Sequence, residues 1–222
     1  MAIGPASYRY NFSVDNNEVD ANDTLKILGV TLDRRLNFVA HVSEQVKKAC
    51  AKASALRRIR RFLPLDVMCR LYKAYILPHL EYCCPLLLGV GRSQVKKLED
   101  TNNYILRTIL GYGKHTSYNH LLNIAGIRTL EERRKFQALV LVYKCFHNEA
   151  PRYIEDFFKI KICNYNLRGS GTLLTLPSFN LEWRHKSFSF LAAKLWNSLP
   201  TCVRNAKDIS TFKRLLKKQV FR

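Results

Sequence analysis

The sequence predicts a mainly α-helical protein whose N-terminal part is a small β-hairpin or meander. Apolar and polar side chains alternate over residues 8–14, and residues 25–32 form an apolar, β-branched run; both patterns are typical of strands. From residue 37 onward, apolar residues recur every three to four positions, which is the period of an amphipathic helix. With 222 residues, 47% of them hydrophobic, the chain can form one large domain or two small ones.

The second predicted strand poses a pairing problem. Its sequence, LKILGVTLD over Leu25–Asp33, has the composition of a strand that is buried on both faces inside a larger sheet. The segment before it, DNNEVDAND, is rich in turn residues and leaves room only for a short edge strand at Glu18–Val19. We therefore expect residues 25–32 to form one strand that lacks its natural neighbour.

The helices are predicted from periodicity and from start and stop signals. Pro78 should kink the second helix, Ser93 should cap the third, and the TLEE capping box opens the fifth. Asp208 or Ser210 should cap the last helix, and residues 164–182 read as a loop with one or two short strands. The expected helical ranges are 37–63, 66–87, 93–110, 118–125, 129–147, 188–196 and 211–221, with a short helical turn from residue 150.

These elements group into three segments. Residues 1–36 hold the strands, residues 37–160 form a helical bundle, and residues 161–222 form a C-terminal region of loop, strand and basic helix. The fold class is therefore mainly α: a small N-terminal hairpin or meander, then a helical bundle, then a C-terminal helical segment. No internal repeat or low-complexity tract interrupts the pattern.

The charge of the chain indicates a polyanionic partner. Its 37 Lys and Arg residues outnumber 17 Asp and Glu residues, which gives a net charge of +20. Repulsion among so many like charges lowers the stability of the fold. A charge of this size therefore usually serves to bind a partner of opposite charge. Nucleic acid is the first candidate, as RNA, DNA or an RNA–DNA hybrid, and an anionic membrane surface is the second. The longest apolar stretch, around Leu86–Leu88, is far too short to span a bilayer. Of the two candidates we expect nucleic acid as the partner and no membrane.

Cysteine usage and the first residues indicate an intracellular protein. The seven cysteines are an odd number and form no C-x-x-C pair, so we interpret them as reduced thiols. The opening residues, MAIGPASYRYNF, contain no apolar run of the kind found in signal peptides. We expect the protein in the nucleus or the cytoplasm.

The best candidate site is the polar face of the first helix. Its cations are accompanied by a single acid, Glu44, whereas a merely solvated face usually mixes charges to gain i,i+4 pairs. The last helix repeats this pattern. Cations of this kind favour phosphate contacts, which give affinity without sequence specificity. The candidate residues are Lys47, Lys48, Lys52, Arg57, Arg58, Arg60 and Arg61 in the first helix and Lys213, Arg214, Lys217 and Lys218 in the last.

Aromatic residues and acids add no further candidate site. Tyrosine and phenylalanine side chains can stack on bases, but most of them fall at apolar helix positions, so we assign them to the core. Metal-dependent nucleotidyl transfer needs clustered carboxylates, and the acids here are single or directly adjacent in sequence, as in Glu99-Asp100 and Glu155-Asp156. Motifs for phosphate-binding loops, nucleophile elbows and zinc proteases are absent from the sequence. We predict no catalytic residue, no metal ligand and no cofactor.

Several stretches occur together in a characteristic order. They are LKILGVTLDRRLNFVAHV, LYKAYILPHLEYCCPLL, LEDTNNYILRTILG and TLEERRKFQALVLVYK, followed by SFSFLAAKLWNSLP and STFKRLLKK. This ordered set, over about residues 8–222, resembles the C-terminal half of reverse transcriptases from non-LTR retrotransposons of the LINE type, which include jockey- and CR1-like elements. The resemblance implies that the LGVTLD strand corresponds to the primer grip and that the following helices correspond to the thumb and connecting region.

The resemblance also implies roles and partners. It suggests primer contacts near Leu28, Gly29 and Val30, and a duplex-backbone role for the first helix. The catalytic aspartates and their Mg²⁺ would belong to an upstream palm, which this sequence does not show. The expected function is therefore a non-catalytic C-terminal part of an RNA-directed DNA polymerase, inactive alone, with nucleic acid and a palm-containing polymerase portion in trans as partners. The alternative is a domesticated helical module that binds protein.

Overall fold

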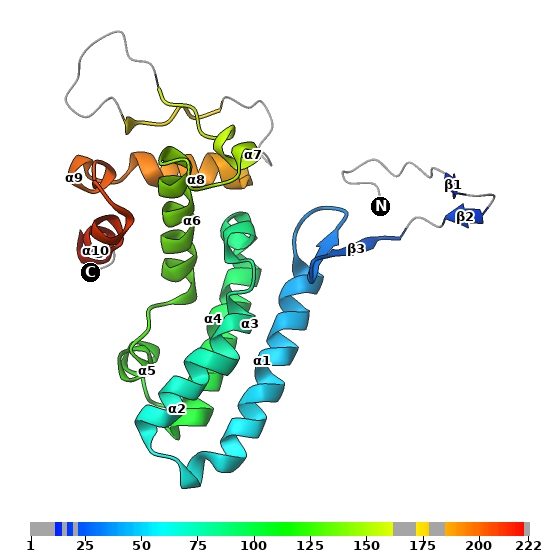
Figure 1. Cartoon of the computed structure of the whole chain (residues 1–222). Coiled ribbons are helices and arrows are strands. Elements are labelled where there is room, and N and C mark those ends of the chain that lie inside the picture. Colours follow the sequence, from blue (N-terminus) through cyan, green and yellow to red (C-terminus); the bar gives the residue numbers. More distant parts are fainter. Residues whose placement is uncertain (1–11, 15–16, 20–21, 162–171, 178–184, 220–222) are drawn as a thin grey trace. The chain divides into compact units, whose positions relative to one another are not determined.

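The computed structural model describes residues 12–14, 17–19, 22–161, 172–177 and 185–219. Helices dominate these residues, and a small antiparallel sheet precedes them, which confirms the mainly α fold (Figure 1). The chain divides into two compact units, of which the first comprises residues 1–83 and 90–130 and the second comprises residues 84–89 and 131–222. The three segments expected from the sequence, residues 1–36, 37–160 and 161–222, stay a prediction.

Two antiparallel hairpins begin the first unit. The strand β1 (Phe12–Val14) pairs with β2 (Asn17–Val19), and β3 (Thr24–Ile27) pairs with β4 (Val30–Asp33). The expected short edge strand is β2. Of the strand predicted over residues 8–14, only the last three residues lie within the described part of the chain.

The run LKILGVTLD is a hairpin, so the prediction of a single strand was wrong. Leu28 and Gly29 form a two-residue turn with φ angles of 46° and 81°, which folds residues 25–27 back onto residues 30–32. A turn of this length follows the twist of its strands when both central residues have positive φ, a conformation that glycine adopts freely. The neighbour that the strand appeared to lack is thus the second half of the same run.

Only one strand of the β3–β4 hairpin is packed against the rest of the first unit. All four residues of β3 are exposed, whereas Val30 and Thr31 of β4 are buried against the helix α1 (Val39–Ile59). Part of this apolar run is therefore exposed, as expected for a strand that lies outside the larger sheet suggested by its composition. An isolated two-stranded hairpin is marginal in water, and α1 supplies the surface that this hairpin needs.

The helices of the first unit pack mainly on α1 and on α4 (Arg92–Leu110). The small residues Ala49 and Ala53 are buried on α1, so that its backbone can approach its neighbours closely. The stripe of α4 recurs at Leu98, Ile105 and Ile109, as expected for one buried helical face. Around these two helices lie α2 (Leu65–Leu71), α3 (Leu77–Leu80), the 3₁₀ turn Arg60–Phe62 and α5 (Tyr118–Ala125).

The second predicted helix is shorter and less regular than expected. A π-helical turn over Tyr72–Ile76 joins α2 to α3, and the Leu77 amide donates to the Tyr72 carbonyl, five residues earlier. The next residue, Pro78, has no amide proton to donate, and the wider turn accommodates it without ending the helix. The α-helix ends at Leu80 rather than at Leu87, and after a short turn the chain continues as the 3₁₀ segment Cys84–Gly89.

One predicted helix cap needs revision, and for another the structure selects one of the two candidates. Gly91 rather than Ser93 occupies the N-cap of α4, without a side-chain cap. Asp208 rather than Ser210 caps the last helix, because its Oδ1 accepts a hydrogen bond from the Thr211 amide at 2.8 Å. The short helix α5 (Tyr118–Ala125) covers the residues that the sequence predicts, and it ends at Gly126, with φ of 60°. Its N-cap is Ser117, which the sequence did not single out.

A buried chain of hydrogen bonds ties α4 to its neighbours. The Tyr72 hydroxyl donates to Asn102 Oδ1 at 2.6 Å, and Asn102 Nδ2 donates to the Tyr118 hydroxyl at 2.8 Å. Tyr118 in turn donates to Glu99 Oε2 at 2.6 Å. Burial, followed by the hydrogen bond to Glu99, strongly raises the pKa of Tyr118. The network fixes one register between these elements, because each buried polar group finds its partner in only one arrangement.

The second unit is built on the helix α6 (Leu130–Phe146). The helices α8 (Phe188–Asn197), α9 (Thr201–Arg204) and α10 (Ile209–Gln219) contribute to its core, and α7 (Arg152–Glu155) follows α6 in the chain. The sequence did not predict α9. Within the described residues of the expected loop-and-strand region, the only pairing is an isolated bridge between Ile160 and Leu174.

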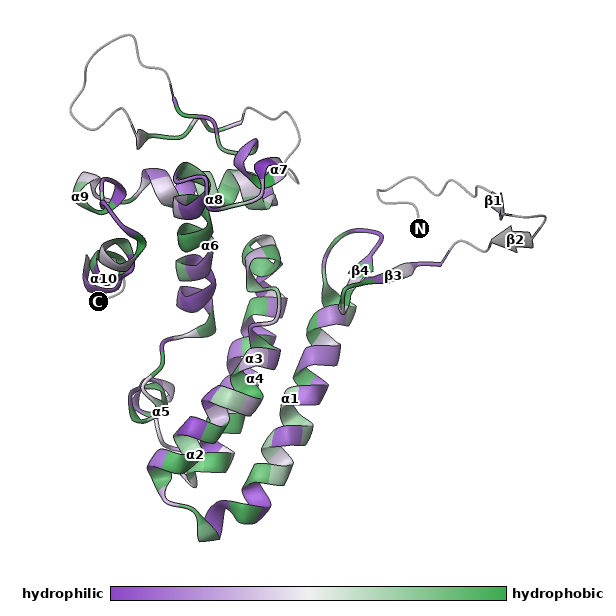
Figure 2. Cartoon of the chain, in the orientation of Figure 1, coloured by the Kyte–Doolittle hydropathy of each residue, from purple (hydrophilic) through white to green (hydrophobic). Residues whose placement is uncertain are grey.

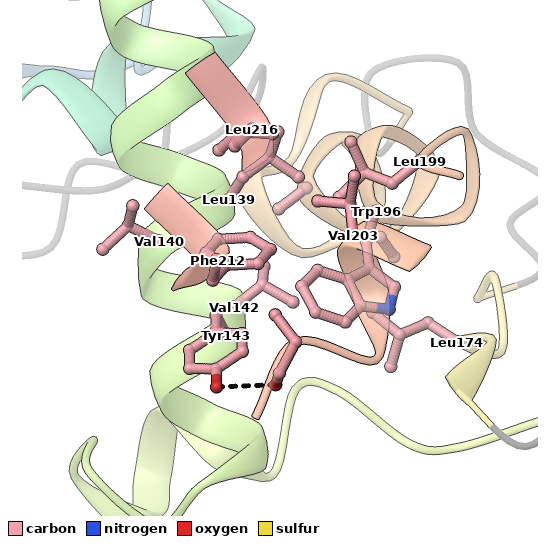
Figure 3. Close-up of a cluster of buried hydrophobic side chains, with 13 residues drawn as sticks. Leu139, Val140, Val142, Tyr143, Leu174, Trp196, Leu199, Val203, Phe212 and Leu216 are labelled. Atoms are coloured by element: carbon pink, nitrogen blue, oxygen red, sulfur yellow. Dashed lines mark hydrogen bonds between the residues drawn. The ribbon is translucent and has the colours of Figure 1, made fainter. Parts of the chain in front are cut away.

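Figure 3 shows the core of this unit, in which aromatic rings from three helices meet. Tyr143 of α6 stacks on Phe212 of α10, with ring centroids 4.4 Å apart, and its hydroxyl donates to the Ala206 carbonyl at 2.9 Å. Trp196 of α8 is 1% exposed, and its Nε1 donates to the Thr172 carbonyl at 2.7 Å. Each buried polar tip is therefore satisfied while its ring fills the core.

Candidate nucleic-acid interface

The cations of α1 surround its exposed side rather than forming one stripe. At 3.6 residues per turn, Lys47 and Arg58 project within about 20° of each other, opposite the buried side of the helix. Lys48 and Lys52 lie on one flank and Arg57 lies on the other. All five are exposed, and Figure 2 shows the ribbon of α1 alternating between hydrophilic and hydrophobic residues. The predicted face is thus a broad cationic surface, roughly three turns long.

One flank of this surface also acts on a neighbouring histidine. Lys48 and Lys52 lie near His79 of α3, whose pKa is lowered first by burial and then by these two cations. Cations that repel a proton at His79 also attract an anion placed at the same flank. This flank therefore presents a positive field beyond the helix itself.

The acid of α1 is already engaged within the fold. Glu44 accepts a hydrogen bond from the Thr31 hydroxyl at 3.0 Å and lies 3.6 Å from the Lys26 ammonium. These interactions, the Thr31 hydrogen bond foremost, lower the pKa of Glu44. Glu44 thus anchors the hairpin to α1. The remaining cations of α1, namely Lys47, Lys48, Lys52, Arg57 and Arg58, and Arg61 in the following turn, have no carboxylate partner among the described residues.

Arg60 has a structural task that the sequence did not reveal. Its Nη1 donates to the Thr108 carbonyl at 3.2 Å, in the last turn of α4. Carbonyls at a helix C-terminus lack intrahelical donors, and a guanidinium there also complements the helix dipole. A side chain at position 111 would displace this contact, because a Cβ there would lie 2.8 Å from the same Nη1. Arg60 therefore joins the turn after α1 to the end of α4.

The second predicted set of cations lies on α10, in the other unit. Arg214, Lys217 and Lys218 are exposed, but Lys213 is half-buried. The Lys217 ammonium lies 5.8 Å from the centroid of the Phe136 ring of α6, in a cation–π contact. Since α1 and α10 belong to different units, each is a separate candidate surface.

The residues with a predicted primer role occupy the turn of the β3–β4 hairpin. Leu28 is 90% exposed at its tip, and the Tyr82 hydroxyl donates to the Leu28 carbonyl at 2.6 Å. Gly29 lies beside the same tyrosine, because a Cβ on it would be 3.1 Å from the hydroxyl oxygen. Val30 is 6% exposed and belongs to the core. Of the three residues, Leu28 is the one that a ligand could reach most easily.

Several tyrosines assigned to the core from the sequence are exposed. Tyr104 of α4 and Tyr75 of the π-helical turn are 60% and 56% exposed, and Tyr153 of α7 is 69% exposed. Helical periodicity predicted the helices that carry these tyrosines, but it did not predict that the tyrosines lie on an exposed face. Which face of a helix is buried depends on the elements that pack against it. These rings are therefore available to a ligand.

Within the described residues, no group of three or more His, Cys, Asp or Glu side chains gathers closely enough to bind a metal ion. No helix of the described ranges is long and apolar enough to cross a membrane.

Comparison with known proteins gives two partial similarities. The chain is 30% identical, over 108 residues, to a probable RNA-directed DNA polymerase from transposon X-element of Drosophila melanogaster; the match covers 46% of this chain and 12% of that protein. It is 26% identical, over 123 residues, to an uncharacterized protein of Caenorhabditis elegans, covering 54% of this chain and 60% of the other. No family model matches the chain, and no solved structure matches it. The similarity to a retrotransposon polymerase is thus distant and partial.

Proposed function

We propose that the first unit binds the sugar–phosphate backbone of a nucleic acid through the exposed cations of α1 and the turn after it. The observation that carries the proposal is the engagement of Glu44 by Thr31 and Lys26, while none of the neighbouring cations of α1 forms an ion pair within the described chain. Cations held on a rigid helix release counterions on binding phosphates and do not read bases. We expect duplex or structured nucleic acid to be bound with little sequence preference.

The distant similarity to a transposon polymerase supports a finer proposal. We propose that the chain corresponds to a thumb-like part of a non-LTR reverse transcriptase, with its nucleic-acid contacts but without its catalytic carboxylates. The chain spans only 12% of the polymerase that it matches, so the activity of that whole protein is not assigned to it. In this proposal Leu28 at the hairpin tip contacts the primer, and a palm-containing polymerase portion is a partner in trans.

Salt dependence tests the backbone-binding proposal. If about five phosphates are engaged, affinity for a DNA duplex should fall with a log–log salt slope of roughly −4 to −5. The triple variant Arg57→Gln, Arg58→Gln and Arg61→Gln should flatten this slope by about three. Arg60 is left unchanged because it holds the end of α4. Fluorescence anisotropy of a labelled duplex measures both quantities.

A charge-matched control separates local contacts from net charge. Lys73→Gln, Arg92→Gln and Lys96→Gln remove three exposed cations of the same unit, outside α1 and the turn after it. This control should keep most of the slope. If the two triple variants had equal log–log salt slopes, binding would depend on net charge alone, and the proposal for α1 would be wrong.

An apolar protein partner is the second candidate, and one observation favours it. Ile59, Phe62 and Leu65 are exposed between and beside the arginines, with Phe62 82% exposed. Apolar docking depends little on salt, whereas phosphate binding weakens steeply. This candidate would be supported instead if the chain bound a protein ligand independently of salt and if Phe62→Ser abolished that binding.

A further inference from the structure

A hollow opens at the C-terminal end of α4, outside the residues that the sequence singled out. It has a volume of about 490 Å³ and is lined by Tyr104, Arg107, Thr108, Tyr112, Gly113 and Lys114. The lining combines two aromatic rings with two cations and contains no acid.

The aromatic rings of the hollow are available and one of them is positioned by a neighbour. Tyr104 is 60% exposed and Tyr112 is 37% exposed. The ring of His120 lies nearly perpendicular to that of Tyr112, with centroids 5.8 Å apart, and this contact helps to position the tyrosine. Exposed, pre-positioned rings of this kind offer stacking surfaces to any base, because every base has a π face.

One of the two cations of the hollow, Arg107, is also pre-positioned. Arg107 Nη2 donates to the Thr116 carbonyl at 2.9 Å, while its buried Nε has no hydrogen-bond partner among the described residues. Lys114 is exposed at the rim. Arg60 reaches the neighbouring Thr108 carbonyl, so the cationic surface of α1 continues to the edge of the hollow. A ligand here therefore meets aromatic rings and positive charge together.

We propose that this hollow binds one unpaired nucleotide at the end of a duplex, with its base on Tyr104 and Tyr112 and its phosphate between Arg107 and Lys114. The inference rests on the proposed backbone binding by α1, which would bring a duplex end to the edge of the hollow. A backbone-binding helix alone does not distinguish a blunt end from an unpaired one. The hollow adds that distinction, because only an unpaired base can leave its stack to reach a tyrosine.

Two duplexes of equal charge test the site on the full chain. One carries a short single-stranded overhang with bases, and the other carries an overhang of abasic nucleotides with the same number of phosphates. The base-containing overhang, at the 3′ or the 5′ end, should bind about tenfold more tightly, as expected for stacking of one base. Tyr104→Ala and Tyr112→Ala should each remove most of this preference, and Tyr104→Phe should keep it.

Two further variants complete the test. Gly113→Leu should also remove the preference, because a Cβ at this position meets no atom within 4 Å and the larger side chain would fill space beside the rings. Tyr75→Ala, at an equally exposed tyrosine outside the hollow, should leave it unchanged. Equal, salt-dependent binding of both duplexes overturns the nucleotide site and leaves the proposal for α1 intact. Failure to bind either duplex overturns both, and a loss of preference in Tyr75→Ala overturns the assignment to the hollow.

Discussion

His41 illustrates how one buried side chain couples the hairpin to α1. It is 0% exposed, and its Nδ1 accepts a hydrogen bond from the Thr31 amide at 3.5 Å. Burial is the main reason that the pKa of His41 lies below its usual range. A protonated imidazole carries a proton on both nitrogens, so Nδ1 could no longer accept the Thr31 amide. The docked hairpin therefore favours neutral His41.

This coupling predicts a loss of stability in mild acid. The folded-state pKa of His41 is below the unfolded value, so the unfolded chain binds more protons between the two values. The stabilising effect is present above the unfolded pKa of about 6.5 and is lost as the pH falls through the folded-state pKa. Hydrogen exchange of the β4 amides should accelerate over this window, and His41→Gln should weaken the pH dependence. His115→Gln, at an exposed histidine, is the control, and an identical profile in His41→Gln would contradict the prediction.

At the scale of elements, the hairpin and α1 form the contact that the sequence did not anticipate. Three of the stretches that carry the resemblance to reverse transcriptases meet here and in the α4 network. Tyr82 bonds the turn of the first stretch, and Tyr72 bonds Asn102 of the third. The three stretches are therefore joined to one another by hydrogen bonds within the first unit.

A lysine introduced into the hairpin should have different effects on its two strands, because one strand is exposed and the other is buried. Ile27 is 48% exposed and Val30 is 6% exposed, although both are apolar, β-branched and paired across the hairpin. Ile27→Lys should leave the free energy of unfolding nearly unchanged and raise solubility, because it charges an exposed edge. Val30→Lys should detach the hairpin, because burying an unpaired ammonium costs several kcal/mol. Urea unfolding and exchange of the β4 amides measure the difference, and equal effects would contradict the observed burial.

At the scale of the whole molecule, the two units have separate cores and separate sensitive positions. Gly89 lies in the second unit, where a Cβ would come within 1.8 Å of the Lys186 carbonyl oxygen. Gly111 lies in the first unit, with φ of 82°, and a Cβ there would press against the Arg60 guanidinium. The first is a clash with backbone, whereas the second combines an unfavourable φ with displacement of a flexible side chain.

Alanine at each glycine should therefore destabilise one unit selectively. Gly89→Ala should lower the stability of the second unit by about 2 kcal/mol, as overpacking against backbone does. Gly111→Ala should lower that of the first unit by about 1 kcal/mol, the cost of a side chain in the left-handed region. Hydrogen exchange at Tyr143 and at Ile105 reports on the two units separately. Gly113→Ala, which meets no neighbouring atom, is the neutral control, and equal loss of protection at both reporters would show that the units unfold together.

The sequence by itself determined the helices whose signals are local. The short helix α5 follows from its terminal glycine, and α4, α6, α8 and α10 follow from apolar periodicity, because these signals lie within a few residues of one another. It also located the cations of α1. Tertiary structure decided what those residues do. LKILGVTLD became a hairpin because α1 and Tyr82 support its turn and one strand.

The same distinction separates the parts of the candidate interface. Glu44 and Arg60 read as one acid and one base of a charged helix, yet their partners, Thr31 and Thr108, lie 13 and 48 residues away. The hollow joins the last turns of α4 to the loop after it, and its cationic edge comes from the turn after α1. Contacts across such separations leave no periodic trace in the sequence, because they depend on which faces the packed helices turn toward one another.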